Sequence, residues 1–191
     1  MAIGAGSYAA IGSAGATPPT KVITVSFSSS GTGSSAGWAK PVKSGKATST
    51  FALTVGADPS AGAQVILNNV QAALPPEPTF TTDNYNAGSP RWYIQLASGA
   101  YLFGYPSISG LNTPPDTFAW SVNSCPSVDP NTYYSYVDAL AAISSQCGTG
   151  DTVSGVLVVA DSDQTYYANP RITSATDTIT DLQYNGVTTF K

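Results

Sequence analysis

Residues 91–105 read RWYIQLASGAYLFGY and contain two strand patterns separated by a short polar segment. Arg91–Leu96 and Ala100–Tyr105 are rich in the aromatic and branched side chains that strands favour. Ser98-Gly99 lies between them and is a turn signal. Two strands joined by so short a turn pair antiparallel. The sequence therefore predicts an antiparallel hairpin here.

Strand patterns recur on both sides of this hairpin. Further strands are predicted over residues 21–27, 48–55, 117–123, 153–160, 165–172, 177–184 and 187–190. Residues 153–160 are a nearly continuous apolar run, which is typical of a strand covered on both faces. The Ser- and Gly-rich residues 28–37 are predicted to be a loop.

Two helices are predicted between the strands. Asp58-Pro59 offers a cap and a first-turn proline, and Pro75-Pro76 ends the segment. Its apolar side chains follow helical spacing: Ala63, Ile66, Leu67, Val70 and Leu74. A second helix, capped near Asp129 and ended by Gly148, has the apolar set Tyr133, Tyr136, Val137, Leu140, Ile143 and Cys147.

The order of these elements predicts a mainly β protein. An antiparallel β-sandwich, jelly-roll-like, with two short helices inserted between strands fits it best. An immunoglobulin-like sandwich is the alternative, which two helices disfavour. We expect an uncharged Ala/Gly/Ser-rich N-terminal arm over residues 1–20 and a single β-sandwich domain over residues 21–191.

Composition excludes several functions. The 191 residues carry a net charge of −4, only 9% are charged, and none is His. Catalytic sites that need His are therefore excluded, and two Cys are too few for a zinc site. Glu77, the one Glu, lies among prolines and is expected to be a solvated linker charge. We expect no enzymatic activity and no resident cofactor.

Charge and hydropathy also limit the partners. Lys40, Lys43 and Lys46 form the one basic cluster, which is too small to predict nucleic-acid binding in an acidic protein. No apolar run approaches the roughly 18 residues of a membrane span. The arm carries the large apolar side chains Ile3, Tyr8 and Ile11. Because three side chains cannot order twenty residues alone, we expect the arm to associate with another copy of the chain.

Cys125 and Cys147 bracket the second predicted helix. A disulfide between them requires a short helix that begins near Tyr133 and ends before Cys147, since five extended residues reach only about 17 Å. The sequence favours this disulfide over two buried thiols, because the hydroxyl-rich surface is typical of exposed environments.

Two further sets of residues are candidates for binding. Asp161 and Asp163 place two carboxylates on one side of an extended chain and could hold calcium, with a solvated turn as the favoured alternative. Trp38, Tyr166 and Tyr167 are candidates for stacking on a sugar or a partner.

These observations predict a non-enzymatic building block of a virion or other surface assembly, which self-associates through its arm. The alternative is a secreted adhesion or glycan-binding module, with a host or cell-surface glycan as the ligand. Both place the protein in a virion or at an extracellular surface.

Overall fold

The structure is a computed structural model and describes residues 22–39, 50–58, 61–83, 90–106, 118–147, 151–161, 175–188 and 190. It is mainly β, with two antiparallel sheets and one short α-helix. The predicted arm, with Ile3, Tyr8 and Ile11, and the cluster of Lys40, Lys43 and Lys46 lie outside the described residues. No helix in the described ranges has the length and apolar character needed to cross a membrane.

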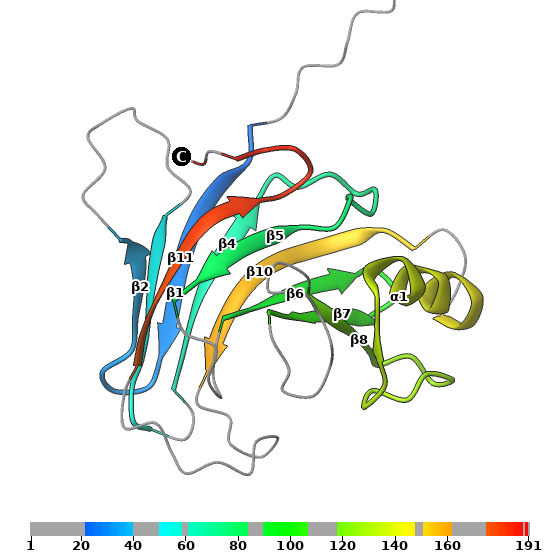
Figure 1. Ribbon diagram of the computed structural model, residues 1–191, viewed down its shortest axis with the longest axis horizontal. Helices are drawn as coiled ribbons and strands as arrows, with labels where there is room; N and C mark the ends of the chain where they lie inside the picture. The colour runs from blue at the N-terminus through cyan, green and yellow to red at the C-terminus, as the bar shows by residue number, and fades with distance from the viewer. Residues whose placement is uncertain are drawn as a thin grey trace, which may run out of the picture.

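The larger sheet has seven strands (Figure 1). In spatial order they are β1 (Thr24–Ser30), β4 (Gly62–Asn68), β10 (Val153–Asp161), β6 (Arg91–Leu96), β7 (Tyr101–Tyr105), β8 (Ala119–Asn123) and β9 (Tyr133–Tyr134). The smaller sheet has the order β2 (Ser35–Trp38), β3 (Phe51–Val55), β11 (Ala175–Gln183) and β5 (Thr79–Thr82).

The two sheets share one hydrophobic core in a sandwich-like arrangement. Alternate residues of each strand point into it: in β4, for example, Ala63, Val65 and Leu67 are buried. Its largest fully buried side chains include Trp92, Trp120, Tyr184, Phe51 and Phe190. The other side chains of the larger sheet form its outer face, which carries the candidate site.

The first predicted helix is wrong, because residues 62–68 form strand β4. The sequence GAQVILN satisfies both a helical and an alternating pattern, as short apolar runs often do. β4 lies between β1 and β10, and pairs with both along its length. On its outer face Ile66 lies opposite Leu157. The strand therefore has apolar residues on both faces, which hid its period of two.

The hairpin of residues 91–105 is confirmed as β6 and β7, which pair antiparallel. The predicted loop over residues 28–37 is wrong in part, since it contains the end of β1 and most of β2. Sequence patterns also missed the short strands β5 and β9. The predicted strand over residues 165–172 lies outside the described residues.

The disulfide is confirmed, and the second predicted helix is confirmed in part, because Tyr133 and Tyr134 form β9 instead of its first turn. α1 (Tyr136–Ala142) begins at the N-cap Ser135, whose hydroxyl accepts the Asp138 N–H. A π-helical turn, Ile143–Cys147, follows it. Cys147 is bonded to Cys125, with 5.3 Å between their Cα atoms. The α-helix is short, as the geometry of this disulfide required.

Candidate ligand-binding face

Aromatic side chains cover part of the outer face of the larger sheet. The aromatic row consists of Tyr93 on β6, Tyr101, Phe103 and Tyr105 on β7, and Tyr133 on β9. Successive rings lie 5.2 to 5.9 Å apart between centroids. The first four rings are half-buried, and Tyr133 is 36% exposed. The row is a fixed apolar platform rather than a set of independent side chains.

Arg91 joins this platform to the neighbouring strands. Its Nη1 and Nη2 atoms donate to Oδ1 and Oδ2 of Asp161, at 3.1 and 2.5 Å. Its guanidinium carbon lies 5.0 Å from the centroid of the Phe103 ring and 6.0 Å from that of Tyr105. The bidentate ion pair and the two aromatic rings therefore fix the orientation of the Arg91 guanidinium.

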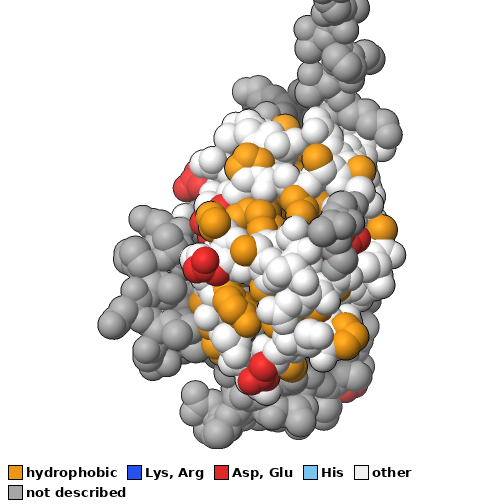
Figure 2. Space-filling model, turned by 90° about the vertical axis from the view of Figure 1, so that its right-hand side faces the viewer, with side chains coloured by type: hydrophobic (Ala, Val, Ile, Leu, Met, Phe, Trp, Pro, Cys, Tyr) orange, Lys and Arg blue, Asp and Glu red, His pale blue; other side chains and the backbone are white. Residues whose placement is uncertain are grey.

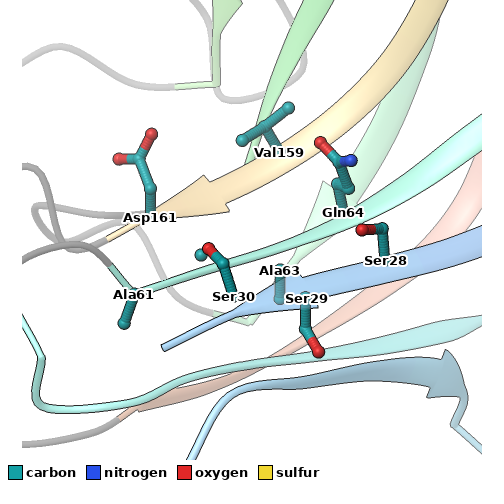
Figure 3. Close-up of a pocket in the computed structure, with 9 residues that line it drawn as sticks. Ser28, Ser29, Ser30, Ala61, Ala63, Gln64, Val159 and Asp161 are labelled. Atoms are coloured by element: carbon teal, nitrogen blue, oxygen red, sulfur yellow. The ribbon is translucent and has the colours of Figure 1, made fainter. Parts of the chain in front are cut away.

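A polar hollow of about 320 Å³ lies on the other side of this ion pair. It is formed by the ends of β1, β4 and β10 (Figure 3). Ser28, Ser30, Gln64, Val159 and Asp161 point to the outer side of the sheet, whereas Ser29, Ala61 and Ala63 point the other way. The outer face therefore changes from aromatic to hydroxyl and amide groups across the Arg91–Asp161 pair.

The phenol of Tyr93 keeps its proton at physiological pH. Burial raises the pKa of Tyr93 above its ordinary value, and the neighbouring phenol of Tyr101 raises it further. A phenol that keeps its proton both donates and accepts hydrogen bonds. At Tyr93 the row accordingly offers an apolar ring and an uncharged polar group together.

The structure places few of the predicted binding residues on this face. Asp161 lies in the ion pair with Arg91, whereas Asp163, Tyr166 and Tyr167 lie outside the described residues. Trp38 is half-buried, with its ring 5.1 Å from that of Phe51 and 5.3 Å from that of Phe27. In the described part of the chain, no cluster of three His, Cys, Asp or Glu residues could hold a metal.

Glu77 has a role that the sequence did not predict. Although the residue is exposed, its Oε1 accepts the Nε1–H of Trp120 at 2.8 Å. The hydroxyl of Tyr136 donates to the Pro75 carbonyl at 3.0 Å, and burial raises the pKa of this phenol. The proline-rich segment is thus fastened to β8 and α1.

Sequence reasoning missed the aromatic row, although a signal was present. Tyr101, Phe103 and Tyr105 alternate along a predicted strand, and Tyr93 lies in its hairpin partner.

Comparison of the chain with protein-family models, with curated proteins and with solved structures found no significant match.

Proposed function

We propose that the protein is a non-catalytic glycan-binding module that binds a neutral, extended polysaccharide on the outer face of its larger sheet. The observation that carries the proposal is the aromatic row beside the Arg91–Asp161 pair and the polar hollow. Sugars present C–H faces that pack on aromatic rings and a rim of hydroxyl groups that need polar partners. This face supplies both within a few strands.

The charge of the protein favours an uncharged glycan. The chain is acidic, with a net charge of −4. Arg91, the one Lys or Arg among the described residues, is neutralised by Asp161. On the end of the molecule seen in Figure 2, the charged side chains of the described residues are all acidic. The net negative charge of the protein would repel a polyanionic glycan.

The test is binding to cellulose, chitin, xylan and mannan by the full chain and by the double variant Tyr105→Ala/Tyr133→Ala. We expect the wild type to bind at least one of them, and the variant to bind about tenfold or more weakly, since each lost ring contact is worth about 1 kcal/mol. Affinity gels measure the soluble polymers and sedimentation assays the insoluble ones.

Val137→Ala is the matched control, because Val137 is 74% exposed on α1 and lies outside the proposed face. It should bind as the wild type does, and thermal melting should show that both variants are folded. If the wild type binds none of the four polysaccharides, or the double variant binds equally well, the proposal is wrong.

A second candidate function is that of a building block in a surface assembly. Two further proposals belong to it: a jelly-roll-like form of the sandwich, and a calcium site at Asp161 and Asp163. One observation favours it: β1, a seven-residue strand, lies at the end of the larger sheet. An end strand presents backbone N–H and C=O groups to which a segment of another chain can add. The arm of a neighbouring copy is the segment proposed.

Deleting residues 2–19 tests this second candidate. We expect the full chain to form a closed particle or filament and the truncated chain to be a folded monomer, since the arm would supply the added strand. Sedimentation velocity measures both masses. A monomeric full-length chain, or a truncated chain that assembles normally, would contradict the assembly role and leave the glycan proposal untouched.

A further inference from the structure

We infer that the bound polysaccharide runs across the strands and that the site binds internal sugar units rather than a chain end. The polar hollow is the subsite farthest from the aromatic row. The inference rests on the proposed glycan-binding function. It concerns a line of five outer-face residues that the strand register brings together: Ser28, Gln64, Val159, Arg91 and Tyr105.

The strand register aligns these residues across the sheet. Ser28 is paired with Gln64, and Gln64 with Val159. Val159 is in turn paired with Arg91, whose guanidinium lies over the ring of Tyr105. The five residues come from the five adjacent strands β1, β4, β10, β6 and β7. Four strand spacings of about 4.8 Å give a line of about 19 Å, which is long enough for several linked sugar rings.

The two ends of the line differ in chemistry. Tyr105 provides an aromatic ring at one end, and the Arg91 guanidinium, paired with Asp161, lies 6.0 Å from the centroid of this ring. Val159, in the middle of the line, is apolar. Gln64 and Ser28 provide an amide and a hydroxyl in the hollow at the other end. Both are uncharged groups that can donate to and accept from sugar hydroxyls.

This arrangement predicts how affinity depends on chain length. A short oligosaccharide reaches the aromatic row and the ion pair, whereas a longer one also reaches the hollow. Each added hydrogen-bonded ring should tighten binding until the line is covered. A module that captured a single terminal sugar would show no such gain.

The test uses the cello-, xylo-, manno- and chito-oligosaccharide series, each from disaccharide to hexasaccharide, with calorimetric titration of the full chain. For the wild type we expect affinity to rise about tenfold or more over the series that binds. Gln64→Ala should bind the shortest ligands as the wild type does and lose about tenfold for the longest. Tyr105→Ala should weaken binding at every length.

Asn68→Ala is the matched control, since Asn68 lies on the same face of the same strand and pairs with Thr24 rather than with a residue of the line. It should follow the wild type at every length. If wild-type affinity does not rise with length, or Gln64→Ala weakens all lengths equally, the inference is wrong although glycan binding stands. If no series binds to the wild type at any length, the proposed function itself is wrong.

Discussion

Replacing Trp120 by alanine is expected to lower the free energy of unfolding by about 3–5 kcal/mol, the usual cost of removing a fully buried tryptophan. Its side chain has no exposed surface. Its ring lies 4.8 Å from that of Tyr136 and 6.1 Å from that of Phe118. A Cβ atom at Gly104 would lie 2.7 Å from the indole, so the glycine provides the space that this ring fills.

Urea denaturation followed by circular dichroism measures this loss. Glu77→Gln is the control, because its amide oxygen can still accept the indole N–H while every packing contact stays. We expect its stability to be close to that of the wild type. An alanine variant that lost less than about 1 kcal/mol, or a glutamine variant that lost as much, would contradict the assignment of this stability to packing.

Removing the disulfide by Cys125→Ser/Cys147→Ser is expected to cost about 3 kcal/mol, because the bond closes a loop in the unfolded chain. The two cysteines are separated by 22 residues. For a chain of this size the loss corresponds to a fall in melting temperature of about 10 °C. Calorimetry of the wild type and the variant measures it.

Two controls accompany this prediction. Thiol titration of the denatured, unreduced wild type should find no thiols. A reductant should lower the melting temperature of the wild type toward that of the variant and leave the variant unchanged. Two titratable thiols, or equal melting temperatures without reductant, would show that the bond does not form in solution and would weaken the case for an extracellular protein.

The sequence alone determined the features that depend on neighbouring residues. The hairpin of residues 91–105 followed from strand-forming residues around a Ser-Gly turn, and α1 from its helical spacing. The disulfide followed from the lengths of helix and extended chain between two cysteines. Each of these decisions involves residues within about one supersecondary unit, where local geometry leaves few alternatives.

The remaining features depend on contacts between distant segments of the chain. Residues 62–68 fit a helix or a strand locally, and became β4 because β1 and β10 pair with its two edges. The Arg91–Asp161 pair joins residues 70 positions apart. The line from Ser28 to Tyr105 exists because three antiparallel registers align and the Arg91 guanidinium lies over the Tyr105 ring. Strands pair through backbone N–H and C=O groups, which every residue except proline carries in full. The residues of one strand therefore do not determine its neighbours, and the packing of the whole core selects them.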